Sequence, residues 1–159
     1  MGIPEWRDTW LDIAEVISRR SKCSRRKVGA VLVAADGKTL VGVGYNGAPA
    51  GFDEGISTTC VDFCPRARGE TSLSEGYGLT CPAAHAEVNV LMRYPKESYN
   101  GGTIVVTSAC CADCAKVVCN SGVKRVIMCV SPEDKHRDPE GVIAFMESCG
   151  LEVVVEEVV

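Results

Sequence analysis

The chain has 159 residues, of which 46% are hydrophobic and 24% are charged, so its length and composition suit one packed domain and exclude disordered and fibrous proteins. No apolar run approaches the roughly 18 residues that cross a bilayer, and the N-terminus has no apolar signal stretch, so we expect a soluble, cytoplasmic protein without a membrane partner. The net charge of -4 argues against binding along an extended nucleic acid.

The first half of the chain predicts a helix, a hairpin and a long irregular stretch. Apolar residues recur at spacings of three and four from Pro4 to about Arg20, which predicts an amphipathic helix. Two β-branched runs, at 28–34 and 39–44, flank Asp36-Gly37, and this signal predicts an antiparallel hairpin. The stretch from Tyr45 to about Pro82 is too long for an ordinary connection, so we expect it to be functional.

The second half of the chain alternates helices and strands. Helices are predicted at Ala83 to about Tyr94, Cys111 to Ser121 and Asp138 to Cys149, and strands at Thr103 to Ala109, Lys124 to Val130 and Leu151 to at least Val155. This alternation implies right-handed parallel crossovers within one sheet. The sequence therefore predicts a single α/β domain over 1–159, a three-layer α/β/α sandwich. Its mixed five-stranded sheet would have strands 4 and 5 parallel, and a Cys-rich insertion would span about 47–82.

Ten cysteines are many for a chain without a secretory signal, and metal binding explains them better than a disulfide scaffold does. Three of them, Cys119, Cys129 and Cys149, lie in apolar runs, where we expect them to pack in the core. The remaining seven lie in loops or at the starts of elements, where metal ligands usually lie. These are Cys23, Cys60, Cys64, Cys81, Cys110, Cys111 and Cys114.

Two short motifs begin consecutive predicted helices: His85-Ala86-Glu87 and Cys111-Ala112-Asp113-Cys114. Cysteines three residues apart at a helix start lie on one face, and the positive end of the helix favours thiolates. One His and two Cys provide three zinc ligands and leave the fourth position open, as in catalytic sites. Zinc lowers the pKa of a water bound there to about 7, and Glu87 is the candidate for moving protons.

Each motif also has an ordinary explanation. His85 could be a packed histidine, Glu87 a carboxylate favoured by the helix dipole, and the C-x-x-C motif a redox or chance pair. The two motifs together, at helix starts in this order of elements, favour a metal site. An alternative from another class is a non-catalytic binding module stabilised by zinc, but a closed structural site has no use for the unliganded carboxylate of Glu87.

These motifs resemble the H-x-E and P-C-x-x-C signature of the zinc-dependent cytidine and deoxycytidylate deaminases. The segments Cys23-Ser24-Arg25, Val28-Gly29-Ala30-Val31 and above all Gly44-Tyr45-Asn46-Gly47-Ala48-Pro49-Ala50-Gly51 resemble the deoxycytidylate (dCMP) deaminase branch. The resemblance covers nearly the whole chain. It implies a cytidine deaminase-like fold and the zinc-dependent hydrolysis of dCMP to dUMP and ammonia in pyrimidine nucleotide metabolism.

The same resemblance implies roles for individual residues. Glu87 would carry protons to N3 and to the amino group of cytosine, and Asn46 would hydrogen-bond to the sugar. Arg25 would contact the 5′-phosphate, a task that suits a guanidinium group. Ala86 and Ser108 complete the implied substrate-binding set.

The resemblance further implies a homo-oligomer, often a hexamer, that dCTP and dTTP regulate. The segment from Gly44 to Gly51 would lie near the effector site, with Gly44, Tyr45, Gly47 and Gly51 as its candidate residues. Alternatively, these glycines could serve only a turn, and Tyr45 could only pack.

Members of this branch commonly hold a second, structural zinc ion. Here Cys23, Cys60, Cys64 and Cys81 stand at the corresponding places. Four sulfurs would suit a closed tetrahedral site that holds a loop of little apolar content. The alternative is four reduced thiols without a metal.

The chain departs from the family pattern at two places. Cys110 replaces the proline before C-x-x-C and adds a competing thiolate, although the strand end at 107–109 keeps Cys111 and Cys114 in register as the ligands. After the fourth strand, the segment 131–136 replaces an aromatic or acidic-aromatic segment, and His136 is interpreted as an exposed loop residue. A C5-modified dCMP and another nucleobase therefore stay open as alternative substrates.

Overall fold

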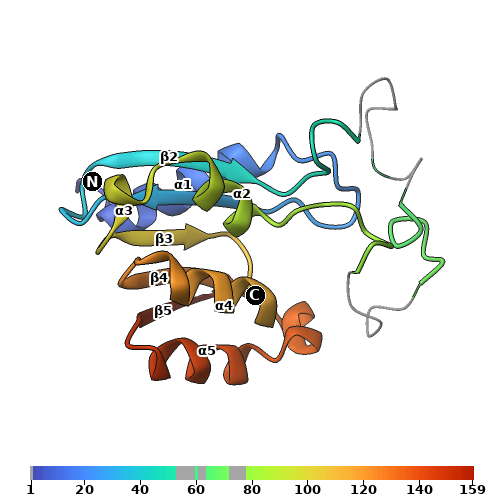
Figure 1. Cartoon of the computed structure of the whole chain (residues 1–159). Coiled ribbons are helices and arrows are strands. Elements are labelled where there is room, and N and C mark those ends of the chain that lie inside the picture. Colours follow the sequence, from blue (N-terminus) through green and yellow to red (C-terminus); the bar gives the residue numbers. More distant parts are fainter. Residues whose placement is uncertain (1, 53–59, 61–63, 72–77) are drawn as a thin grey trace.

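The computed structural model describes residues 2–52, 60, 64–71 and 78–159 of the chain. Its elements are α1 (Trp6–Ser18), β1 (Gly29–Val33), β2 (Leu40–Tyr45), α2 (Ala86–Arg93), α3 (Lys96–Tyr99), β3 (Thr103–Val106), α4 (Ala112–Ser121), β4 (Arg125–Val130), the 3-10 helix η3 (Pro132–Arg137), α5 (Pro139–Ser148) and β5 (Glu152–Glu157). The strands form one sheet in the order β2-β1-β3-β4-β5 (Figure 1).

The sheet is mixed, as the sequence predicts. β1 pairs antiparallel with both β2 and β3, whereas β3 pairs parallel with β4 and β4 pairs parallel with β5. The parallel pairs follow from the helices α4 and α5, which carry the chain back across the sheet between strands. The predicted parallel pairing of the last two strands is confirmed.

Helices cover both faces of the sheet, which makes the predicted three-layer α/β/α sandwich (Figure 1). On one face, Trp10 and Ala14 of α1 pack against Val31 and Val33 of β1. On the other face, the larger core cluster joins α2, α4 and α5 to the alternate residues of β1, β3 and β4. All five residues of β1 are therefore buried, which explains why its sequence is a continuous apolar run.

The predicted hairpin between β1 and β2 is present, and its turn has the expected chemistry. The Asp36 carboxylate accepts hydrogen bonds from the backbone N–H groups of Lys38 and Thr39, each at 2.8 Å. Gly37 has a φ of 72°, a left-handed conformation that glycine adopts without strain. Local turn chemistry therefore fixes the first antiparallel pair.

Capping residues define the end of α4 and the start of α5, two helices that the sequence predicts. Gly122 ends α4 with a φ of 102°, and the Asp138 side chain accepts a hydrogen bond from the backbone N–H of Gly141 at the start of α5. In the part of the chain that the structure describes, α3 and η3 are short elements that the sequence analysis did not predict. Each has six residues or fewer, too short for a periodic pattern to be recognised.

Cys149 corrects one expectation about the core. It is exposed, because it forms the C-cap of α5 beyond Met146, the last buried residue of that helix. Cys119 and Cys129 are partly buried, and Cys119 packs against the larger core cluster.

The two ends of the stretch between β2 and α2 lie side by side. Gly47 and Ala84 form an isolated antiparallel bridge with hydrogen bonds of 3.0 and 2.9 Å. Within this stretch, the backbone N–H of Cys60 donates to the carbonyl oxygen of Lys22 at 3.1 Å, which ties the insertion to the segment before β1. Among the described residues, no helix has the length and apolar character that a membrane span requires.

Candidate active site

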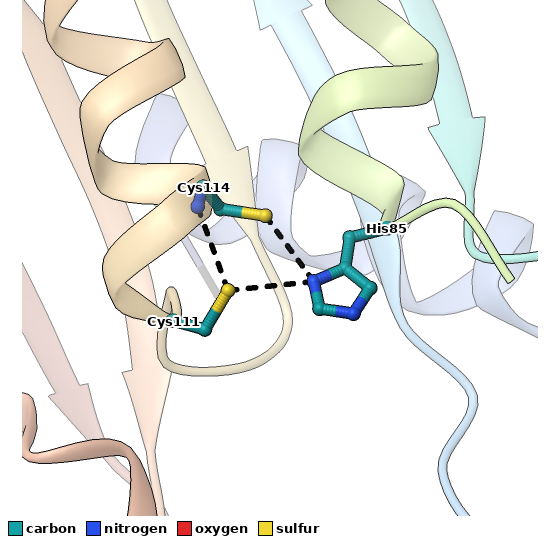
Figure 2. A group of neighbouring side chains, drawn as sticks. All are labelled: His85, Cys111 and Cys114. Atoms are coloured by element: carbon teal, nitrogen blue, oxygen red, sulfur yellow. Dashed lines mark hydrogen bonds between the residues drawn. The ribbon is translucent and has the colours of Figure 1, made fainter. Parts of the chain in front are cut away.

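Two helix starts meet at one place in the fold. His85 is the N-cap of α2 and Cys111 is the N-cap of α4, and these two helices pack against each other on one face of the sheet. Cys114 lies on the first turn of α4. Figure 2 shows the imidazole of His85 directed at both sulfurs. The two predicted motifs, 26 residues apart in sequence from His85 to Cys111, are therefore brought together.

The ligand atoms of His85, Cys111 and Cys114 all lie within 4.8 Å of one another. The Nδ1 atom of His85 is 3.2 Å from the sulfur of Cys114 and 3.5 Å from the sulfur of Cys111 (Figure 2). Within the described parts of the chain, no fourth His, Cys, Asp or Glu joins this group. Two sulfurs and one imidazole nitrogen are a donor set that zinc prefers, so these residues fit a zinc ion with an open position.

The electrostatics of the pair of thiols follow from their hydrogen bonds. The pKa of Cys111 is lowered to about 4, first by the side-chain hydrogen bond from Cys114. Hydrogen bonds from His85 and from the backbone N–H of Cys114 act in the same direction. The Cys114 thiol keeps the proton of the pair, so its pKa is raised. Burial opposes the charged form of His85, but the hydrogen bond with Cys111 and the charge of Glu87 leave its pKa raised overall.

Glu87 lies beside the ligand group without belonging to it. It sits in the first turn of α2, only 3% of it is exposed, and it lines the same cavity as His85. The thiol of Cys110 is fully buried next to the Glu87 carboxylate, and burial followed by that negative charge raises the pKa of Cys110 well above its usual value. Cys110 is not a member of the three-residue ligand group.

A cavity of about 400 Å³ opens in front of Glu87. Its polar lining is mainly cationic, and it combines the helix start at His85 with residues of the segment before β1, of the insertion and of η3. Its charged and imidazole-bearing residues are Arg25, Arg26, Arg66, His85, Glu87, Glu133, His136 and Arg137. Such a cavity suits a small polar ligand with a negative charge.

The predicted substrate-binding residues occupy different environments. Arg25 lines the cavity and donates from Nη1 to the carbonyl oxygen of Arg66 at 3.2 Å. Asn46 lines it too, and its amide accepts from the N–H of Val28 at 2.9 Å and donates to the carbonyl oxygen of Arg26 at 3.0 Å. Asn46 thus braces the segment that carries the arginines.

The other two predicted residues differ in their access to the cavity. Ala86 is buried and lines the cavity between His85 and Glu87. Ser108 is 1% exposed and is not among the lining residues. Its hydroxyl instead accepts a hydrogen bond from Nη1 of Arg137 at 2.8 Å.

Of the four predicted effector residues, two line a second cavity and two do not. This cavity, also of about 400 Å³, is lined by Tyr45 and Gly47 together with the cationic residues Arg20, Lys22 and Arg93. The guanidinium carbon of Arg93 lies 5.6 Å from the centre of the Tyr45 ring. Gly44 lies under α2, where a Cβ atom would stand 2.8 Å from the Cβ of Val90, and Gly51 has open space around it.

The four remaining loop cysteines gather between the two cavities. Cys23, Cys64 and Cys81 line both cavities, and Cys60 lines the second. The sulfur of Cys60 accepts from the backbone N–H of Ser24 at 3.2 Å, and the Cys64 thiol lies 3.6 Å from the carbonyl oxygen of Thr80. Burial raises the pKa of both Cys23 and Cys81. The sequence analysis grouped these four residues, and all four line the second cavity, but they do not form a ligand group like that of His85, Cys111 and Cys114.

Arg66 and Arg137 were missed by the sequence analysis although both line the active-site cavity. Arg66 belongs to the insertion, and no motif marks it. Arg137 follows Asp134 by three residues, a spacing that allows an ion pair on a helical turn, and this was its only signal. His136 is exposed, as expected, but it also lines the cavity.

The α/β/α sandwich and an open three-ligand site beside a buried carboxylate define the class of zinc-dependent nucleobase deaminases. The model of the cytidine and deoxycytidylate deaminase zinc-binding region matches residues 4–130. The chain therefore belongs to the cytidine and deoxycytidylate deaminase family.

Relatives within this family are deoxycytidylate deaminases. The enzyme of Mycobacterium phage D29 is 39% identical over 132 residues, covering 80% of this chain and 96% of the phage protein. The human enzyme is 32% identical over 141 residues, covering 88% of this chain and 71% of the human protein. The crystal structure of the dCMP deaminase of cyanophage S-TIM5 in complex with dCMP and dUMP matches with a TM-score of 0.69 and 27% identity, over 99% of this chain and all of that chain.

Proposed function

We propose that this protein hydrolyses dCMP to dUMP and ammonia. The observation that carries the proposal is the buried carboxylate of Glu87 beside a three-residue zinc site at the wall of a cationic cavity. Deoxycytidylate deaminases among the relatives, and the similar cyanophage enzyme with dCMP and dUMP bound, support the same substrate.

His85, Cys111 and Cys114 would hold the zinc ion. When bound there, zinc supplies a water whose pKa is lowered to about 7 and which can attack C4 of the base at neutral pH. Glu87 would take up the two protons of the attacking water one after the other, and would pass one to N3 and the other to the amino group that leaves as ammonia. Glu87 is buried in the first turn of α2 and lines the cavity beside His85, which places its carboxylate next to the proposed metal site.

The proposed substrate contacts use the cationic side of the cavity. Arg25 contacts the 5′-phosphate, and Asn46 faces the sugar while it holds the backbone at Arg26 and Val28. Ala86 lies between a metal ligand and the proton carrier, where its backbone meets the base. Ser108 contributes through the arginine that it holds.

A substrate panel tests the proposed reaction. The purified protein is assayed for ammonia release with dCMP, 5-methyl-dCMP, deoxycytidine, CMP and dAMP. We expect dCMP to have the highest kcat/KM of the panel. A higher value for 5-methyl-dCMP or dAMP would replace dCMP by a C5-modified or a different base, and no ammonia from any compound would contradict the proposal.

We also propose a second, structural zinc ion at Cys23, Cys60, Cys64 and Cys81. Their common place at the wall of the second cavity supports it, because one ion there would tie the insertion to the segment before β1. Metal analysis of the purified protein should then find about two zinc ions per chain. The double variant Cys60→Ser, Cys64→Ser should lose one of them, and an unchanged metal content would contradict the second site.

The second cavity supports a regulatory proposal. We infer that Arg20, Lys22 and Arg93 bind the phosphates of dCTP or dTTP in this cavity, with Tyr45 beside the base. We further propose that the protein is a homo-oligomer, a hexamer, as the family resemblance implies. Light scattering should report the hexamer, and dCTP should change the rate of dCMP deamination in the wild-type protein but not in Arg93→Gln. An effect of dCTP that survives in this variant would contradict the assignment of the cavity.

A further inference from the structure

Arg137 is anchored at the wall of the active-site cavity. It ends η3, and only 14% of its side chain is exposed. Its Nη1 atom donates to the hydroxyl of Ser108 at 2.8 Å and to the carbonyl oxygen of Ala109 at 2.7 Å. These acceptors directly precede Cys110 and the zinc ligand Cys111, so both hydrogens of Nη1 fix the guanidinium relative to the metal site.

The opposite edge of the same guanidinium has no hydrogen-bond partner among the described residues. Nε is buried without one, and the nearest oxygen of Asp134 is 3.9 Å away, beyond hydrogen-bond reach. Nη2 donates to none of the residues that the structure describes and, unlike Nε, it is not enclosed. Nη2 is therefore the donor that an anion in the cavity can reach, while the enclosed Nε faces Asp134.

The charges around Arg137 leave one positive charge over. Asp134 is fully buried, and Arg26 donates to both of its carboxylate oxygens. Two guanidinium groups therefore surround one carboxylate, and the three together carry a charge of +1. Glu87 and Glu133 line the same cavity, but among the described residues neither forms an ion pair with Arg137, so this wall of the cavity favours an anion.

We propose that Arg137 binds the 5′-phosphate of the substrate and makes the enzyme prefer a nucleoside monophosphate over the nucleoside. The inference rests on the proposed function, because the phosphate is the only anionic group of dCMP. Arg137 is held in place before the substrate arrives, whereas Arg25 is exposed and makes one hydrogen bond to the insertion. Arg137 is therefore the main phosphate contact, and Ser108 is a positioning residue that acts through it.

Substrate selectivity is the readout that separates phosphate binding from a structural role. In Arg137→Gln, we expect the ratio of kcat/KM for dCMP to kcat/KM for deoxycytidine to fall by about 10- to 100-fold, the effect of losing hydrogen bonds to a charged group. This loss of selectivity should appear mainly as a higher KM for dCMP. Lys135→Gln is the matched control, because Lys135 is an exposed cation on the same short helix that does not line the cavity.

Two further variants keep the test decisive if Arg137→Gln folds poorly. Arg137→Lys retains the charge but loses the planar guanidinium that Ser108 and Ala109 hold in place, so it should recover part of the selectivity. Ser108→Ala removes one of the two anchors of Nη1 and should lower the selectivity for dCMP by a smaller factor. Equal losses for dCMP and deoxycytidine in all three variants would overturn the inference and assign Arg137 a structural role.

Product binding gives a readout that does not depend on turnover. Calorimetry of dUMP and deoxyuridine should show that Arg137→Gln weakens the binding of dUMP about 10- to 100-fold and that of deoxyuridine far less. If the wild-type protein deaminates dCMP and the variant keeps its selectivity, the inference fails and the proposed function stands. If no cytosine nucleotide is deaminated but dUMP binding depends on Arg137, the proposed function fails and the phosphate contact stands.

Discussion

At the scale of single residues, the site depends on a carboxylate that is kept next to the metal ligands but outside them. Glu87 follows His85 by two residues, so the start of α2 carries the proposed ligand and the proposed proton carrier together. Its 3% exposure limits the contact of its charge with solvent, and the cavity gives the substrate access to it. This arrangement separates metal binding from proton transfer, so one can be removed without the other.

Glu87→Gln tests this separation. The variant keeps the shape of the side chain but cannot take up a proton, so ammonia release from dCMP should fall by at least 10²- to 10⁴-fold, the range that proton transfer usually contributes. Zinc content and the melting temperature should not change. Glu97→Gln, on the exposed side of α3, is the control. Turnover of Glu87→Gln close to that of the wild type would contradict the role in proton transfer.

The grouping of His85, Cys111 and Cys114 could be predicted from the sequence because its signal is local. A three-residue spacing at a helix start and one histidine two residues before a glutamate are visible without knowledge of the fold. The neighbourhood of Arg137 and Cys110 could not be predicted in this way. Arg137 reaches the site through η3, and Cys110 reaches Glu87 because α2 and α4 pack together, so both contacts depend on tertiary structure.

At the scale of elements, close packing places the start of α2. Gly42 and Gly44 of β2 have no side chains, and this lets Tyr94 and Val90 lie directly on the strand. A Cβ atom on Gly44 would stand 2.9 Å from the backbone nitrogen of Val90, closer than real Cβ contacts allow. The glycines of β2 therefore set the distance between the sheet and the helix that carries Glu87.

Gly44→Ala should move α2 away from β2. We expect the free energy of unfolding to fall by about 1–3 kcal/mol, as for other overpacked sites, and zinc affinity to fall because His85 moves relative to α4. Chemical denaturation and zinc titration measure the two effects. Gly51→Ala adds the same methyl group where nothing lies within 4 Å and should leave the stability unchanged. Equal stability of Gly44→Ala and the wild type would show that α2 does not depend on this contact.

Asp134 holds η3 in place and gives stability a dependence on pH. It closes a capping box with Ser131 and pairs with Arg26. Burial disfavours its charge, but the hydrogen bonds from Arg26 and Ser131 outweigh burial and leave its pKa below the usual value. The contribution of Asp134 to the stability of the fold is therefore complete above the pKa of about 4 that it has in the unfolded chain. This contribution is lost as the pH falls through the lower pKa of Asp134 in the folded protein.

Asp134→Asn should accordingly be less stable than the wild type at pH 7, and the difference should narrow below about pH 4. Melting temperatures of both proteins across this range measure it. Asp12→Asn, on the exposed side of α1, controls for the loss of one negative charge. A stability difference that stays constant from pH 7 to pH 3 would contradict the ion pair as its cause.

Elements with a strong period or a turn signal were predicted from the sequence, and short ones were not. The hairpin, α1 and the later alternation of strands and helices agree with the predicted ranges to within a few residues. The strand predicted to run to Ala109 ends at Val106, because Thr107 turns its hydroxyl to accept from the backbone N–H of Gly29 and the chain then leaves the sheet. These last three residues lead to the zinc site.

At the scale of the whole molecule, the sandwich provides two cavities with the loop cysteines between them. The active-site cavity and the second cavity share Cys23, Cys64 and Cys81 in their walls. A structural ion at these cysteines would therefore connect the proposed catalytic and regulatory sites. The predicted single domain with an insertion at about 47–82 stays a prediction, and much of the insertion lies outside the described residues.

Zinc removal tests the central claim most directly. The protein is depleted with a chelator, and dUMP and ammonia formed from dCMP are quantified before depletion, after depletion and after zinc is added back. We expect both products in equal amounts, their loss on depletion, and their recovery with zinc in the wild-type protein but not in Cys111→Ala. Undiminished product formation by the depleted protein, or no dUMP from the zinc-loaded protein, would contradict a zinc-dependent dCMP deaminase.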